Sequence, residues 1–75
     1  MVKVDGRKLR AWRERRLLTL RELGELSGVW FHTIHAIEVG NQEPRASTVR
    51  KLIAALGITA EDVLRSENDE EKAAA

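Results

Sequence analysis

The feature that most constrains this chain is a pair of short helical segments separated by a glycine, between Thr19 and Gly40. Thr19 and Glu22 have the spacing of a capping box, in which a hydroxyl and a carboxylate each satisfy an unpaired backbone N–H group at a helix start. Gly28 follows the first segment and Gly40 follows the second, and both suit the left-handed position that closes a helix. The pattern predicts two short helices joined by a tight turn.

Apolar residues recur at helical spacing along the rest of the chain, and no segment shows the alternation of a strand. We expect about five helices, near residues 5–16, 19–27, 30–39, 46–56 and 59–64. The last is short and opens on a second capping-box pattern at Thr59 and Asp62. The prediction is one all-α domain over residues 1–65. Residues 66–75 carry no large apolar side chain, so we expect an acidic, disordered tail there.

The net charge of +1 hides an uneven distribution of charged residues. Residues 1–16 contain seven lysines and arginines against two acids, whereas residues 60–75 contain six acids against two basic residues. A basic body with an acidic tail fits a domain that binds a polyanion. Two solvated faces explain the same distribution equally well, so charge alone does not decide between these interpretations.

Several classes of protein are disfavoured by what the sequence lacks. Without cysteine there are no disulfides and no thiolate metal sites, and no apolar stretch is long enough to cross a bilayer. No signal-peptide pattern is present, so we expect a cytoplasmic protein. No nucleophile–base pair or glycine-rich phosphate loop is evident, and the chain is small for a substantial pocket. We therefore expect neither an enzyme nor a cofactor.

A possible metal-binding series, His32, His35 and Glu38, repeats at intervals of three residues. Successive members of such a series rotate by about 60° around a helix, so their side chains diverge. Helical metal sites more often use pairs that are about four residues apart. We therefore expect no metal here.

Two short helices joined by a tight glycine turn form the helix-turn-helix unit, whose second helix enters the major groove of DNA. The segment LTLRELGELSGVWFHTIHAIEVGNQEP also resembles the phage repressor and Cro family, often called XRE. The matching residues are Leu18, Thr19, Glu22, Leu23, Gly28, Val29, Thr33, Ile34, Ile37, Glu38, Gly40 and Pro44. The flanking segments LRAWRERR and STVRKLIAALGITAEDVL fit the family's other helices, so the resemblance covers about residues 7–64. It implies a compact, five-helix, lambda-repressor-like DNA-binding domain with its motif at residues 19–40.

The resemblance also assigns a partner to an unusual arginine. Arg13 shares the inward face of the first helix with Leu9 and Trp12, and Glu38 lies on the inward side of the third helix. In the family, the matching arginine and glutamate form a largely buried ion pair, which implies a pair between Arg13 and Glu38 here. The alternative is that both side chains extend to solvent.

The resemblance implies a DNA-reading surface on the exposed side of the third helix. The positions that read bases in the family correspond to Phe31, His32, His35 and Ala36. The expected phosphate contacts are at Leu20, through backbone N–H groups at a helix start, and at Thr33, Asn41 and Arg45. Histidine can donate to guanine, and an aromatic ring can pack on the methyl group of thymine.

Three residues on this surface depart from the family pattern. Leu20 replaces a glutamine that holds a phosphate, Trp30 replaces a capping serine, and Phe31 replaces a polar residue. Exposed aromatic residues often anchor protein interfaces, so Trp30 and Phe31 could instead bind a protein partner. Trp30 could also fold back onto the second helix or the core. Phe31 is harder to hide, because Leu23 and Ile34 already fill the inward face.

The prediction is a sequence-specific transcriptional regulator, acting as a repressor, that binds double-stranded DNA as a homodimer. The third helix of each subunit would enter successive major grooves of a two-fold operator, with half-sites about one helical turn apart. We expect the dimer contact at the fourth and last helices. The alternative is a protein-interaction module, or an antitoxin-like protein, that binds its partner through Trp30 and Phe31. DNA binding should weaken steeply as salt rises, whereas an apolar interface should not.

Overall fold

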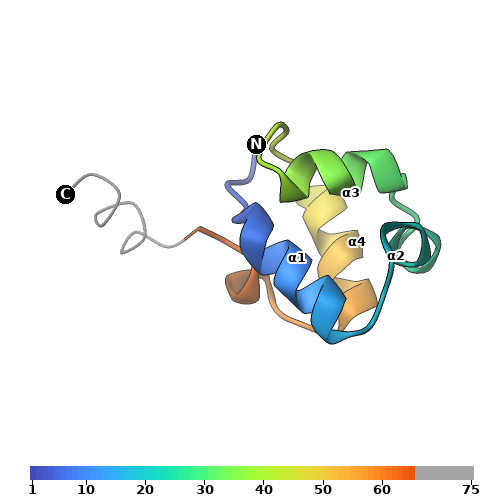
Figure 1. The fold of residues 1–75 in the computed structure, drawn as a ribbon. Coiled ribbons are helices and arrows are strands. Elements are labelled where there is room, and N and C mark those ends of the chain that lie inside the picture. Colours follow the sequence, from blue (N-terminus) through green and yellow to red (C-terminus); the bar gives the residue numbers. More distant parts are fainter. Residues whose placement is uncertain (66–75) are drawn as a thin grey trace.

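The computed structural model describes residues 1–65 as four α-helices and one 3-10 turn (Figure 1). The elements are α1 (Gly6–Arg15), α2 (Leu20–Ser27), α3 (Phe31–Glu38), α4 (Ala46–Leu56) and the turn η1 (Ala60–Asp62). The expected tail at residues 66–75 lies outside the described residues. The first four predicted helices are present, and their ends lie within about one residue of those expected.

The predicted fifth helix is not confirmed, because only the three residues of η1 adopt a helical turn. The Asp62 carboxylate accepts hydrogen bonds from the Thr59 N–H group at 2.9 Å and from the Thr59 hydroxyl at 3.1 Å, so the capping pattern does form. The chain then straightens into an antiparallel bridge between Val4 and Leu64, flanked by backbone hydrogen bonds of 2.8 and 3.0 Å. This pairing with the start of the chain uses backbone groups that a longer helix would need for itself.

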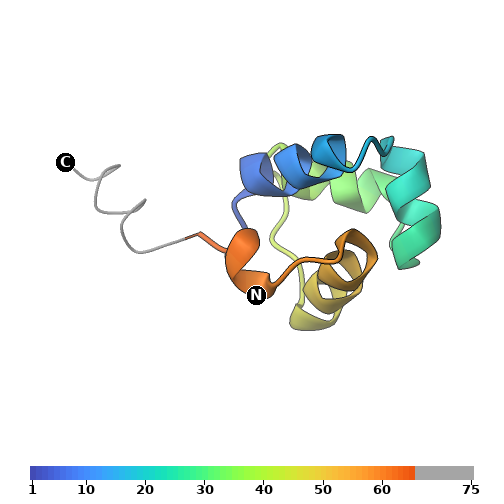
Figure 2. The ribbon, with the colours of Figure 1, turned by 90° about the horizontal axis from the view of Figure 1, so that it is seen from below.

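The core is enclosed by helices on several sides (Figures 1 and 2). α1 and α3 lie along one side, α4 lies on the other, α2 closes one end and η1 closes the opposite end. The buried apolar side chains come from every helix and from both flanking segments: Val4, Leu9, Leu23, Val29, Ile34, Ile37, Val49, Leu52, Leu56 and Val63. Because α3 buries only its inner side, its outer side is left to solvent.

The two helices of the motif are fixed by the predicted capping residues. The Glu22 N–H group donates to the Thr19 hydroxyl at 3.0 Å, and the Thr19 N–H group donates to the Glu22 carboxylate at 2.9 Å. Gly28 ends α2 in the left-handed conformation, with φ of 76°. The Ser27 hydroxyl adds a contact that sequence reasoning missed: it donates to the Leu23 carbonyl at 2.7 Å and accepts from the Val29 N–H group at 3.1 Å. The turn is thus held by side-chain as well as backbone groups.

Two backbone features fix how α1 meets its neighbours. A side chain at Gly6 would collide with the carbonyl oxygens of Ile37 and Glu38, so a glycine is required where α1 begins beside the end of α3. At its other end, α1 is followed by Leu17, which adopts a positive φ of 59° and leaves 88% of its surface exposed. A leucine rarely takes this left-handed conformation, which costs about 1–2 kcal/mol. The chain therefore accepts local strain to turn from α1 into α2.

Candidate functional site

A buried ion pair joins α1 to the end of α3. The Arg13 Nε and Glu38 Oε2 atoms are 2.8 Å apart, and Arg13 Nη2 donates to Glu38 Oε1 at 3.0 Å. Arg13 Nη1 also donates to the Leu18 carbonyl oxygen at 2.9 Å. The side chains are only 12% and 3% exposed, so neither extends to solvent. The hydrogen bonds that Arg13 donates to Glu38 raise the pKa of Arg13, against the opposing effect of burial. The pair places α3 relative to α1 through a bidentate contact.

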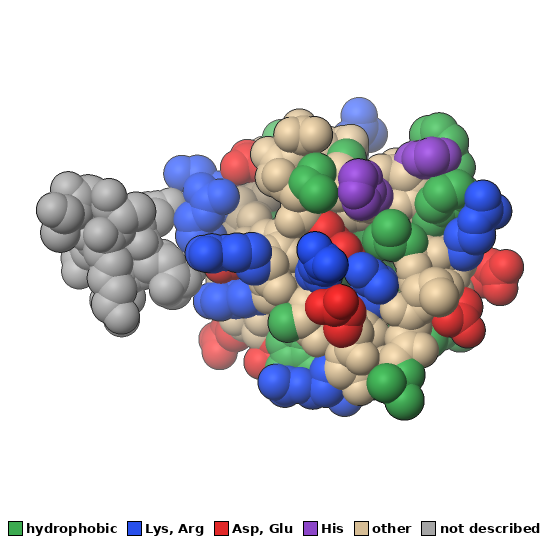
Figure 3. Space-filling view, viewed as in Figure 1, with side chains coloured by type: hydrophobic (Ala, Val, Ile, Leu, Met, Phe, Trp, Pro, Cys, Tyr) green, Lys and Arg blue, Asp and Glu red, His purple; other side chains and the backbone are tan. Residues whose placement is uncertain are grey.

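The outer side of α3 carries the side chains that the sequence selected as base readers. His32 and His35 are exposed, whereas Phe31, Thr33 and Ala36 are half-buried. Figure 3 shows both histidines on one face of the molecule, with hydrophobic side chains beside them and arginines or lysines lower on the same face. The structure therefore presents two ring donors together with apolar groups on a helix whose other side is fixed in the core.

Trp30, Phe31 and His32 form a contiguous group of rings, which we call the ring cluster. The Trp30 and His32 ring centres are 4.7 Å apart in an edge-on arrangement, and the Phe31 and His32 centres are 4.2 Å apart with a tilt of 32°. The Arg21 guanidinium of α2 lies 4.4 Å from the centre of the Phe31 ring, at a distance typical of cation–π contacts. The contact of Arg21 with Phe31 could not be predicted, because residues ten apart on different helices show no pattern in the sequence.

The structure decides the exposure of Trp30, which the sequence left open, and it differs from the expectation for Phe31. Trp30 does not fold back: it is 67% exposed. Phe31, which was expected to be the harder one to hide, is half-buried. The reason lies in α2, where a Cβ at Gly24 would stand 3.4 Å from the Phe31 Cβ and 3.0 Å from the Val29 carbonyl oxygen. Because Gly24 has no side chain, the start of α3 comes close to α2, and Phe31 lies between them.

The start of α3 has no side-chain cap. Trp30 occupies the N-cap position and its indole makes no capping hydrogen bond, as its lack of an acceptor oxygen predicts. At the start of α2, in contrast, the capping box already engages the N–H groups of Thr19 and Glu22. The N–H groups of Leu20 and Arg21, within the first turn of α2, are the ones left for a ligand. These hydrogen bonds also lower the pKa of Glu22, so a carboxylate charge stands beside that turn.

The remaining residues expected to contact phosphate lie in and around the loop after α3. Asn41 and Arg45 are exposed, and the Asn41 N–H group donates to the Ala36 carbonyl at 2.9 Å. The Asn41 backbone donor is therefore used in closing α3, which leaves its side chain for a ligand. Leu20 is half-buried against the core, so only its backbone can serve such a contact.

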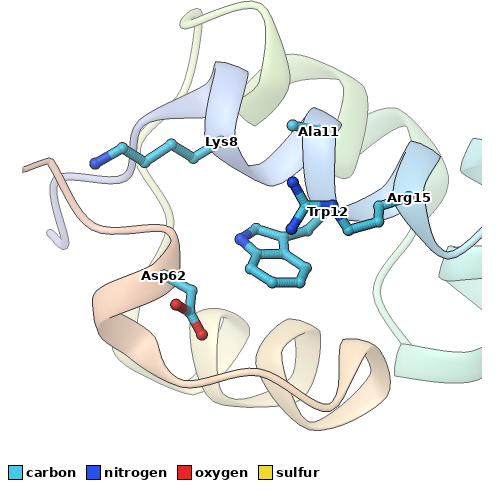
Figure 4. A pocket seen from close by; sticks show the side chains of 5 residues that line it. All are labelled: Lys8, Ala11, Trp12, Arg15 and Asp62. Carbon is cyan, nitrogen blue, oxygen red and sulfur yellow. The ribbon is translucent and has the colours of Figure 1, made fainter.

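A hollow lies away from the outer side of α3, between α1 and η1 (Figure 4). It has a volume of about 280 Å³ and is lined by Lys8, Ala11, Trp12, Arg15 and Asp62. The Arg15 guanidinium lies 4.5 Å from the centre of the Trp12 ring. Arg16, 5.2 Å from the same ring, donates from Nε to the Leu56 carbonyl at 3.0 Å. The charge of Arg16 interacts favourably with the dipole at the C-terminal end of α4. Its hydrogen bond thus joins the end of α1 to the end of α4.

Residues 1–65 offer no group of three histidine, cysteine or acidic side chains that could hold a metal ion. The series His32, His35 and Glu38 diverges, because Glu38 points inward to Arg13 while both histidines face solvent. Within the same described part of the chain, no helix is long and apolar enough to span a membrane.

Residues 6–66 match the family model described as a helix-turn-helix domain. No curated protein matches the chain.

Solved structures share the fold. The restriction-modification controller protein C.AhdI from Aeromonas hydrophila is 28% identical, with a TM-score of 0.73 over 76% of this chain and 86% of its own. The biofilm master regulator SinR, solved in complex with DNA, is 26% identical, with a TM-score of 0.72 over 75% of this chain and 90% of its own. A hypothetical transcription factor from Neisseria is 24% identical, with a TM-score of 0.75 over 91% of this chain and 78% of its own, and it supports the fold alone.

Proposed function

Since the chain belongs to the helix-turn-helix domain family, of the XRE type, we propose that it is a sequence-specific DNA-binding regulator of transcription that inserts α3 into the major groove. One observation carries the proposal: the inner side of α3 is fixed in the core, while its outer side presents exposed histidines beside an aromatic surface. A regulator of similar fold, SinR, has been solved bound to DNA, which supports DNA as the partner.

The residues of α3 divide by the chemistry they offer. His32 and His35 can donate to guanine N7 or O6, and Phe31 and Ala36 offer apolar contact to thymine methyl groups. Thr33 within α3 can bind a phosphate, as can Asn41 and Arg45 beyond its end and the N–H groups at the start of α2, near Leu20. Phosphate contacts fix the position of the protein, whereas base contacts give specificity.

We further propose that the protein acts as a repressor and binds a two-fold operator as a homodimer. Half-sites about one helical turn apart would then receive α3 from each subunit. Ile53 of α4 and Leu64 beyond η1 are only partly covered by the core, which suits them to a contact between subunits.

The test is selection from random double-stranded oligonucleotides with purified protein, carried out at two salt concentrations. We expect an enriched palindrome whose affinity falls steeply with salt. Recovery of no enriched sequence would contradict the proposal.

The roles of individual residues are tested on the selected sequence. His32→Ala should relax base preference at one position of each half-site, whereas Arg45→Ala should weaken binding to all sequences about equally. If both substitutions act alike on all sequences, the assignment of base readers is wrong.

A second candidate function is favoured by the exposed Trp30 ring. On this alternative the ring cluster anchors a protein partner, in an interaction module or an antitoxin-like protein. Such binding would persist at salt concentrations that release DNA, because burial of apolar surface is not screened.

A further inference from the structure

We propose that the ring cluster reads the C5-methyl group of pyrimidines, so that the protein distinguishes thymine from uracil and 5-methylcytosine from cytosine. The inference rests on the proposed insertion of α3 into the major groove. The C5-methyl group is the apolar feature of the base edges there, and it is best recognised by apolar contact. Trp30 and Phe31 supply apolar rings at the N-terminal end of α3, where recognition helices contact base edges.

The cluster is already arranged as a binding surface. Trp30 presents most of its ring to solvent, and Phe31 supports the cluster from behind, in the space left by Gly24. His32 lies between the two, with ring centres 4.7 and 4.2 Å from theirs. Since each ring rests on another, little side-chain freedom remains to be lost on binding. A free tryptophan on a mobile loop would not have this advantage.

Its setting favours DNA over an apolar protein partner. The Arg21 guanidinium stacks at 4.4 Å on Phe31 and keeps a positive charge next to the rings. His32 within the cluster and His35 further along α3 are exposed and can donate to bases. The cluster thus offers apolar rings beside a cation and beside ring N–H groups. The edge of the major groove offers methyl groups beside hydrogen-bond acceptors, with phosphates nearby. The two surfaces are chemically complementary.

The expected effect of one methyl group on DNA affinity is modest but measurable. Burial of one methyl group against an apolar surface changes an equilibrium constant by about three- to fivefold. Replacement of thymine by uracil removes only that group, and replacement of cytosine by 5-methylcytosine adds only that group. The two exchanges therefore test the same contact in opposite directions.

The experiment measures dissociation constants of the full chain for matched duplexes built on the selected sequence. One set carries thymine or uracil, and the other carries cytosine or 5-methylcytosine, at each pyrimidine in turn. For the unmodified protein we expect at least one position where the methyl group tightens binding about three- to fivefold. Trp30→Ser should abolish most of this preference, and Trp30→Phe should keep most of it.

Leu17→Ala is the matched control, because it removes another exposed apolar side chain at the turn between α1 and α2, away from the start of α3 (Figure 1). It should leave the methyl preference unchanged. Circular dichroism checks that each variant is folded.

Three outcomes overturn the inference in distinguishable ways. If the unmodified protein selects a duplex but binds its methylated and unmethylated forms equally, methyl reading is wrong and DNA binding stands. If Trp30→Ser retains both affinity and methyl preference, the cluster lies off the DNA and is better explained as a protein interface. If no duplex is selected at all, the inference fails together with the proposed function.

Discussion

The N-terminal ends of α2 and α3 differ in how their backbone N–H groups are capped. α2 begins with a reciprocal capping box between Thr19 and Glu22, whereas α3 begins at Trp30 without a side-chain cap. A serine, threonine, asparagine or aspartate at such a position typically contributes about 1 kcal/mol to stability. Residues at the start of α2 thus stabilise the helix, while Trp30 at the start of α3 provides no cap and presents its ring to solvent.

α3 is instead fixed from its other end. Ile34 and Ile37 are buried in the core, and Glu38 pairs with Arg13 beside the close approach of Gly6. The C-terminal end of the helix that we propose to enter DNA is therefore held by the core and the ion pair. Its N-terminal end has no side-chain cap and is positioned by the packing of Phe31 beside Gly24.

The largest expected change in stability comes from breaking the ion pair between Arg13 and Glu38. Arg13→Met leaves the Glu38 carboxylate buried without a partner, which should destabilise the protein by about 3–5 kcal/mol. Chemical denaturation or thermal melting measures the loss. Because a domain of this size has a modest reserve of stability, the single variant is expected to be largely unfolded.

The double variant Arg13→Met, Glu38→Leu provides the control. It removes both charges and fills the site with apolar groups, so it should recover most of the stability. A single variant as stable as the parent would show that α3 does not depend on this pair.

The second prediction compares the N-terminal ends of α2 and α3. Thr19→Ala should lower the free energy of unfolding by about 1 kcal/mol, since it removes one half of the capping box. Trp30→Ser should instead raise it by about 0.5–1 kcal/mol, because serine can accept a hydrogen bond from the first turn of α3. Thermal melting compares both with the parent. Equal losses in the two variants would mean that Trp30 supports its helix in a way its contacts do not suggest.

The smallest effect is a pH dependence confined to the start of α2. The folded-state pKa of Glu22 is lowered by its hydrogen bonds with Thr19, so the ionised form stabilises the fold. That contribution is complete at neutral pH and is lost as the pH falls below about 4 and the carboxylate becomes protonated. The difference in melting temperature between the parent and Glu22→Gln should therefore shrink on acidification. A difference that is constant from neutral to acidic pH would contradict this account.

Much of the fold could be predicted from local signals. The capping residue Thr19, the left-handed Gly28 and the apolar spacing of α4 each depend on a few neighbouring residues, and signals of this kind are enough to predict the first four helices. The extent of the last helix could not be predicted, because it depends on a bridge between Val4 and Leu64, which lie far apart in the sequence.

The exposed surface at the start of α3 is also hard to predict, because it depends on contacts between residues on different helices. Whether Trp30 or Phe31 would be exposed depends on how closely α3 approaches Gly24, and this distance is a property of packing between helices. The contact of Arg21 with Phe31 likewise joins two helices. Residue types identified the candidate site, but only the fold shows which of its side chains are exposed.

The bridge between Val4 and Leu64 also makes the described chain nearly a closed ring. If a short linker joined the two bridged segments and the ring were opened at the exposed Leu17, the helices would keep the same neighbours. A circular permutant that begins with α2 and ends with α1 would bury the same core. The order in which the helices are encoded is thus separable from the way they pack.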